Sequence, residues 1–122
     1  MKVAMPVNGQ SMQDEVCESF GRAPFFLFYD TESEVPNFVD NVAAKSRGGA
    51  GIQAAQSLVD AAADVLLTPR CGENAAEVLA AANVAVYKTE GRSIEANLEA
   101  FGNGSLPLLQ ETHPGFHGHQ ND

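Results

Sequence analysis

Basic residues gather in three polar segments of a sequence that is otherwise poor in positive charge. Residues 8–24, 43–51 and 69–74 hold four of the seven bases, namely Arg22, Lys45, Arg47 and Arg70. Two of these segments run into predicted helix starts, where unpaired backbone N–H groups and the positive end of the helix dipole favour an anion. The glycines at 48–51 would let the backbone approach a ligand closely. This pattern predicts a site for a compact anion. The alternative is that the bases lie in these loops only because loops are exposed.

Two cysteines could add soft ligands to the same site. Cys71 lies at a predicted helix N-terminus beside Arg70, and Cys17 lies in the first polar segment. Such surroundings favour the thiolate, which binds soft metals and exchanges sulfur. Met12 is a candidate thioether ligand, and Phe20 is the phenylalanine that we expect at the rim. The alternatives are a loop thiol without a role for Cys17 and a small packing residue for Cys71.

Three histidines lie close together near the end of the sequence. His113, His117 and His119 could capture copper, nickel or zinc. The proline and glycines between them deny the imidazoles a preformed geometry, so the alternative is a solvated tail.

Residue patterns of common catalytic sites are missing. The sequence contains no GxxxxGK[ST], GxSxG or HExxH motif, and Cys71 does not begin a phosphatase loop. Asp30, Asp40 and Asp64 stand near predicted strands, but nothing pairs them as the carboxylates of a two-metal site. We therefore expect a binding protein rather than an enzyme.

Size and charge narrow the class of protein. The 122 residues, with a mass of 12.9 kDa and 44% hydrophobic residues, suit one compact domain with its own core. A formal net charge of -9 opposes binding to nucleic acid or to an anionic membrane. No apolar run approaches the roughly 18 residues of a membrane span, and the N-terminus shows no signal-peptide pattern. We expect a cytoplasmic protein with two free thiols.

Hydrophobic patterning predicts five strands and three helices in the order βββαβαβα. Strands are expected near 2–7, 25–29, 35–42, 64–68 and 84–87, with Pro6 placing the first strand at an edge or at the point where it leaves its ladder. Helices are expected after 48–51, after 71–74 and after a Ser93 cap. This order predicts an α/β fold of ribonuclease H-like type, a mixed five-stranded sheet with helices on its faces. We expect one domain over 1–104 and a flexible histidine-containing tail over 105–122.

The same elements position the candidate site. In this topology the three polar segments leave the sheet at one end, beyond the carboxyl ends of parallel strands, where open α/β sheets bind their ligands.

Several stretches resemble the dinitrogenase iron-molybdenum cofactor biosynthesis family, whose small domains carry or store metal-sulfur clusters. The matching stretches are KVAMPV at 2–7, FGRAP at 20–24, GGAGI at 48–52, TPRCGENA at 68–75 and AANVAVY at 81–87. The phenylalanine-glycine-arginine motif and the Gly-Ala-Gly helix start are specific in combination. The resemblance covers about residues 1–100.

The resemblance implies a ribonuclease H-like fold and loosely ligated binding of an anionic molybdenum-containing sulfide cluster, of the Mo-Cu-S or Fe-Mo-S kind. It places the family's rim on Arg22, on the turn at 48–51 and on Cys71 with its helix start. Together with the reasoning from residue types, the candidate cluster-binding residues are Met12, Phe20, Arg22, Arg47, Gly48, Gly49, Ala50, Gly51, Arg70, Cys71, Gly72 and Asn74.

The leading hypothesis is a non-catalytic carrier that holds such a cluster for storage, delivery or sensing. Its partners would be the inorganic cluster, cluster donor or acceptor proteins, or a P-loop ATPase, but neither nucleic acid nor a membrane. One alternative is an enzyme that acts on a small phosphorylated substrate at the same rim. Another is a regulatory interaction module for a cluster-delivery ATPase.

Overall fold

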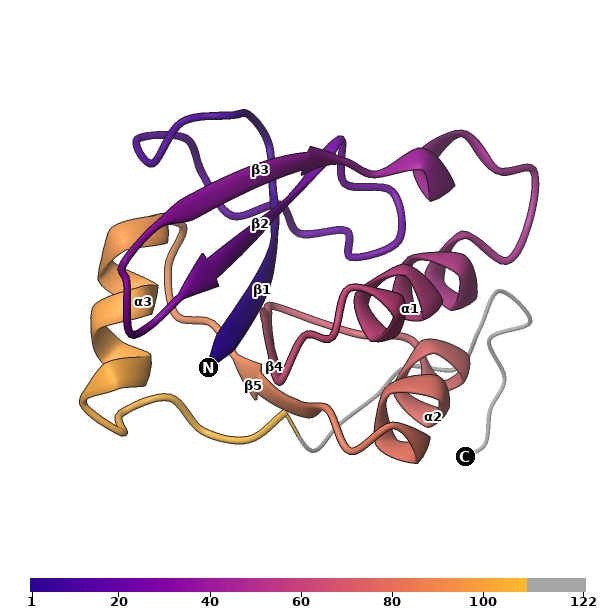
Figure 1. Ribbon diagram of the computed structural model, residues 1–122. Coiled ribbons are helices and arrows are strands. Elements are labelled where there is room, and N and C mark those ends of the chain that lie inside the picture. The colour runs from indigo at the N-terminus through magenta and orange to yellow at the C-terminus, as the bar shows by residue number, and fades with distance from the viewer. Residues whose placement is uncertain (110–122) are drawn as a thin grey trace.

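A computed structural model describes residues 1–109 of the chain, and within them it forms five strands, three α-helices and one 3-10 helix (Figure 1). In chain order these are β1 (Lys2–Val7), β2 (Phe25–Asp30), β3 (Pro36–Asp40), the 3-10 helix η1 (Val42–Lys45), α1 (Ala50–Asp60), β4 (Val65–Thr68), α2 (Glu73–Ala81), β5 (Ala85–Lys88) and α3 (Ile94–Gly102). None of the helices in this described part is long and apolar enough to cross a bilayer.

The strands form one open mixed sheet in the order β3-β2-β1-β4-β5. The pairs β1–β2 and β2–β3 are antiparallel, whereas β4 runs parallel to both of its neighbours. The expected mixed five-stranded α/β sheet with three helices is therefore confirmed.

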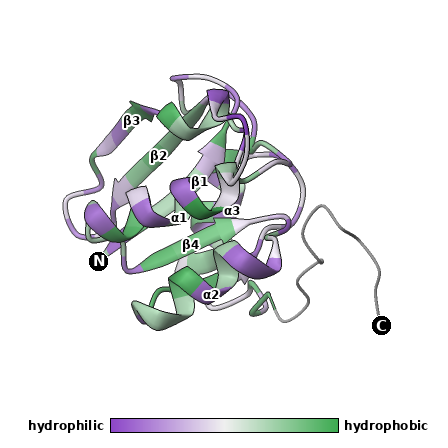
Figure 2. Ribbon diagram, turned by 90° about the vertical axis from the view of Figure 1, so that its right-hand side faces the viewer, coloured by the Kyte–Doolittle hydropathy of each residue, from purple (hydrophilic) through white to green (hydrophobic). Residues whose placement is uncertain are grey.

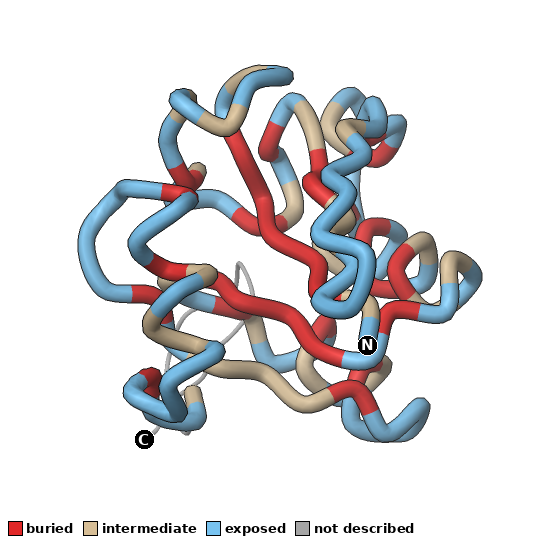
Figure 3. Tube along the Cα trace, turned by 60° about the vertical axis from the view of Figure 1, so that its left-hand side comes forward, coloured by how far each residue is buried: buried red, intermediate tan, exposed pale blue. Residues whose placement is uncertain are grey.

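Each face of the sheet has its own apolar core because side chains alternate along the strands. Leu66 of β4 packs with Leu58 of α1 and Leu79 of α2 on one face. Leu67 packs with Met5 of β1 and Ile94 of α3 on the other. In Figure 1 the sheet accordingly separates α1 and α2 from α3. Figure 2 shows β4 in the green of hydrophobic residues. In Figure 3 the buried stretches of the chain run through the interior, with exposed loops around them.

Pro6 was expected to place β1 either at an edge or at the point where the strand leaves its ladder. β1 is the middle strand of the sheet, so the second alternative holds. Its parallel register with β4 covers only Val3 and Ala4, so the proline lies beyond that pairing. There the Pro6 carbonyl accepts a 2.8 Å hydrogen bond from the Cys17 amide. The missing N–H therefore interrupts no bond of the ladder with β4.

The chain beyond residue 104 continues as part of the packed structure up to residue 109. Leu106 is buried in the core, and the amide of Leu109 donates to the carbonyl of Val86 in β5. The amide of Lys88 in turn donates to Pro107. Residues 105–109 thus belong to the packed structure and not to the flexible tail that was expected from residue 105. The predicted histidine site at His113, His117 and His119 lies outside the described residues.

Candidate functional site

A pocket of about 610 Å³ opens where the loop at 18–22 meets the first turns of α1 and α2. Its volume is within the range of small-molecule sites. We call it the helix-start pocket. Nine of the candidate residues line it, namely Phe20, Arg22, Gly49, Ala50, Gly51, Arg70, Cys71, Gly72 and Asn74. The topology therefore brings all three polar segments to one end of the sheet.

Both helices whose first turns line the pocket have a glycine as their N-cap residue. Gly49 has a φ of 68°, a left-handed conformation that glycine adopts without strain, and Gly72 precedes α2. Neither residue supplies a side-chain hydrogen bond to its helix. On α3, by contrast, the Ser93 hydroxyl accepts a 3.0 Å bond from the amide of Ala96, as the sequence predicted. The first-turn amides of α1 and α2 thus have no side-chain cap to satisfy them.

The loop that carries the phenylalanine-glycine-arginine motif lies directly on the backbone of α1. A Cβ atom on Gly21 would come within 2.8 Å of the Gly51 nitrogen and 2.9 Å of its Cα. Only a residue without a side chain allows this approach. Gly21 therefore fixes the distance between the two walls of the pocket.

Side-chain charges at the helix-start pocket balance. Arg22 and Arg70 are opposed by Glu18 and Glu73, all four of them exposed lining residues. The Arg22 guanidinium also donates to the carbonyls of Ala44 and Ser46, at 2.9 and 2.5 Å. Attraction for an anion must then come largely from the two helix starts, with the arginines as local donors. The prediction counted the arginines and the helix starts but not the two opposing glutamates.

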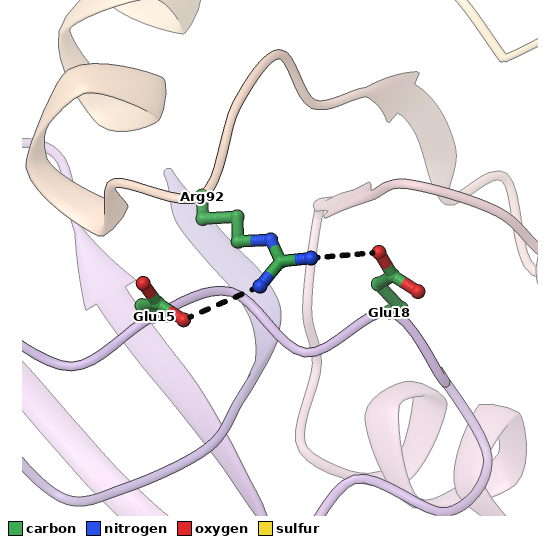
Figure 4. A network of polar contacts seen from close by, with 3 residues as sticks. All are labelled: Glu15, Glu18 and Arg92. Carbon is green, nitrogen blue, oxygen red and sulfur yellow. Dashed lines mark hydrogen bonds and ion pairs between the residues drawn. The ribbon is translucent and has the colours of Figure 1, made fainter.

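Glu18 is itself held by a cation from another part of the chain. Arg92, between β5 and α3, lies 3.4 Å from the Glu18 carboxylate and 3.8 Å from that of Glu15 (Figure 4). The pairs are exposed, so they contribute little to stability. The Arg92 guanidinium nevertheless offsets part of the negative charge of Glu18 at the pocket.

The expectation that Cys71 is a thiolate is wrong. Cys71 lies against the pocket with only 1% of its surface exposed. Burial raises the pKa of its thiol from 9.0 to about 11, because the charged form loses its hydration. The side chain packs with Phe20, Leu66 and Ala75 in the core. At neutral pH it presents a neutral S–H group rather than an anionic ligand.

Four candidates stand apart from the pocket. Arg47 and Gly48 are exposed just before α1 and do not line it. Cys17 is half-buried on the loop after β1, and Met12 lines a different cavity, beside α3. Within residues 1–109, no group of three or more His, Cys, Asp or Glu side chains could hold a metal ion.

Six lining residues were not among the candidates: Glu18, Ser19, Gly21, Ile52, Glu73 and Ala75. Gly21 carried a usable signal, because it stands between two residues that were singled out. The acidic residues could have been found only by asking which charges oppose the arginines.

Known proteins share the sequence pattern and the fold of this chain. The profile of the family described as "Dinitrogenase iron-molybdenum cofactor" matches residues 1–104. This chain belongs to that family. Among solved structures of the family's fold, the apo orange protein of Desulfovibrio gigas is similar at 32% identity and a TM-score of 0.85, covering 89% of this chain and 92% of that one.

Two further proteins are similar to this member of the dinitrogenase cofactor family. A NifB-like protein from Thermotoga is 37% identical with a TM-score of 0.79, over 90% of this chain and 94% of its own. An uncharacterized protein of Methanocaldococcus jannaschii is 25% identical over 90% of this chain and 92% of its own. The likeness thus spans nearly the whole length of each protein.

Proposed function

We propose that this protein is a non-catalytic carrier of an anionic metal-sulfide cluster, bound in the helix-start pocket. The observation that carries the proposal is the convergence of two helix starts without side-chain caps, with Arg22 and Arg70, on one cavity. Backbone amides at helix starts bind compact anions without a dedicated cation cage. Membership of the cofactor family, and similarity to the orange protein, support a metal-sulfide cluster as the cargo.

The donors of the pocket fit a preformed cluster better than a bare metal ion. A sulfide cluster brings its own bridging sulfur atoms, so the protein needs only hydrogen-bond donors and a matching shape. Amides of the helix starts, the Arg70 guanidinium and the neutral Cys71 thiol are donors of this kind. We propose a molybdenum-containing sulfide with copper or iron, held in a cytoplasmic domain of ribonuclease H-like type.

Titration of the apo protein with tetrathiomolybdate and Cu(I), followed by visible absorption and metal analysis, tests the proposal. We expect a stoichiometric coloured complex. Arg70→Ala should weaken binding about tenfold, because it removes a charged donor from the pocket. Arg47→Ala is the matched control: it removes the same charge from an exposed position outside the pocket and should change the affinity less than about twofold.

Two results would contradict the proposal. If the apo protein retained no molybdenum after gel filtration, it would not bind the proposed cluster. Equal weakening by Arg70→Ala and Arg47→Ala would show that net charge, rather than the helix-start pocket, attracts the anion.

The alternative of an enzyme acting on phosphorylated small molecules uses the same pocket and differs in its readout. It requires turnover of a phosphoester that depends on Mg²⁺ and is lost in Arg70→Ala. A carrier shows protection of the cluster without turnover.

A further inference from the structure

A second cavity, of about 700 Å³, is lined in part by residues of α3. Figure 1 shows α3 on the side of the sheet opposite α1 and α2. Its apolar lining comes from Met12, Tyr29, Leu98 and Phe101, all half-buried. Phe101 is held edge-on to Tyr87, with ring centroids 5.3 Å apart. The cavity therefore offers an apolar surface in which an aromatic contact holds Phe101 and the flexible side chain of Met12 can adapt to a ligand.

Acidic side chains surround this apolar lining. Glu34, Glu95 and Glu99 all line the cavity and are all exposed. Among the described residues, no lysine or arginine lines it, and the positive group at its wall is the α-ammonium of Met1. Neither recorded ion pair of the described chain involves these three carboxylates. We call this cavity the acidic groove.

Glu34 reaches the groove from a strained position. It closes the turn between β2 and β3 with a φ of 60°, a left-handed conformation that glycine or asparagine adopts more readily. The turn is well tied: the Asp30 carboxylate accepts from the amide of Glu32 at 2.8 Å, and the Glu34 amide donates to the Asp30 carbonyl at 2.7 Å. A carboxylate thus lines the groove at a turn position where glycine or asparagine would be less strained.

We propose that the acidic groove docks a protein partner through a segment in which lysine or arginine side chains flank leucine-like apolar side chains. The apolar lining would bury the apolar side chains of the segment. The three glutamates would pair with its cations and at the same time relieve their own mutual repulsion. Residues of α3 line the groove, residues at the starts of α1 and α2 line the helix-start pocket, and the two linings share no residue, so a partner docked in the groove would leave the pocket open. This interaction surface goes beyond the proposed cargo and does not depend on it.

The test uses the full-length apo protein and two synthetic peptides, acetyl-KLLKLLK-amide and acetyl-KSSKSSK-amide. We expect saturable binding of the first, with NMR shift changes at the amides of Tyr29, Leu98 and Phe101, and far weaker binding of the second, which carries the same charge without the apolar side chains. The triple variant Glu34→Asn, Glu95→Gln, Glu99→Gln should bind the first peptide about tenfold more weakly, since each exposed ion pair contributes a few-fold. Raised salt should also weaken binding.

A second triple variant, Asp40→Asn, Asp60→Asn, Glu77→Gln, is the matched control. It changes the net charge equally at exposed positions outside the groove and should leave the affinity nearly unchanged. The single variant Glu34→Asn separates docking from folding, because it should weaken binding while the unfolding midpoint stays the same or rises.

Three results would overturn the proposal. They are no saturable binding of the leucine-containing peptide, equal binding of both peptides, and equal weakening by the two triple variants. Because none of these measurements involves metal, failure here is distinguishable from failure of cluster uptake.

Discussion

The nitrogen of Gly51 lies 2.8 Å from the position that a Cβ atom on Gly21 would occupy. The loop before β2 and the first turn of α1 therefore touch backbone to backbone, and this contact sets the width of the helix-start pocket. A side chain at position 21 would have to push the two walls apart.

Gly21→Ala should consequently lower the free energy of unfolding by about 1–3 kcal/mol, the usual cost of forcing an extra methyl into a tight contact. It should also weaken uptake of the metal-sulfide cluster. Urea denaturation and the thiomolybdate titration measure the two effects. Gly48→Ala is the control: a Cβ there meets nothing within 4 Å, so stability should change by less than about 0.5 kcal/mol. Comparable losses in both variants would contradict the role given to the Gly21 contact.

The two cysteines should differ sharply in reactivity. Cys17 is half-buried, whereas Cys71 is 1% exposed with a raised thiol pKa. Iodoacetamide at pH 8 should therefore alkylate Cys17 within minutes and Cys71 only after unfolding, because the thiolate is the reactive form. Peptide mass spectrometry with and without urea reads out each site. Rapid native modification of Cys71 would show that it is a thiolate after all.

The same thiol makes stability depend on alkaline pH. Its pKa is about 11 in the folded chain against an ordinary value of 9.0, so the folded protein keeps a proton that the unfolded chain loses. This contribution is fully present below about pH 9 and is lost as the pH rises toward 11. Urea midpoints across that window should fall less steeply for Cys71→Ala than for the unmodified chain. Cys17→Ala, as control, should keep the steeper slope.

The segment after α3 should contribute to stability through one leucine and not another. Leu106 is buried in the core, while Leu108 is 53% exposed two residues later. Leu106→Ala should cost about 2–4 kcal/mol, as a buried leucine does when truncated. Leu108→Ala should cost less than about 0.5 kcal/mol. If thermal or urea unfolding gave equal effects, the packing of this segment against β5 would be wrong.

Elements with strong local signals could be predicted from the sequence. The Ser93 cap and the apolar run that forms β4 both depend on a few neighbouring residues. Because the topology then follows from connection rules, the three polar segments could be placed at one end of the sheet, and nine candidate residues do line one pocket.

The features that the sequence could not predict depend on contacts between distant parts of the chain. The neutral state of Cys71 results from packing against Phe20 and Leu66, which no local pattern reports. Pro6 left two positions open for β1, and the sequence could not choose the central one, because the choice depends on where the pairing with β4 stops. Arg47 belongs to one of the three polar segments predicted to form the site, yet it does not line the pocket.

The central position of β1 also affects the order in which the protein can assemble on the ribosome. β1 leaves the exit tunnel before the other four strands, and it can pair with the hairpin of β2 and β3 as soon as that hairpin has emerged. Its other neighbour, β4, is synthesised about sixty residues later. Until then one edge of β1 stays open, and such an edge invites pairing with other nascent chains. The topology therefore makes translation the stage at which pairing with other chains competes most directly with folding.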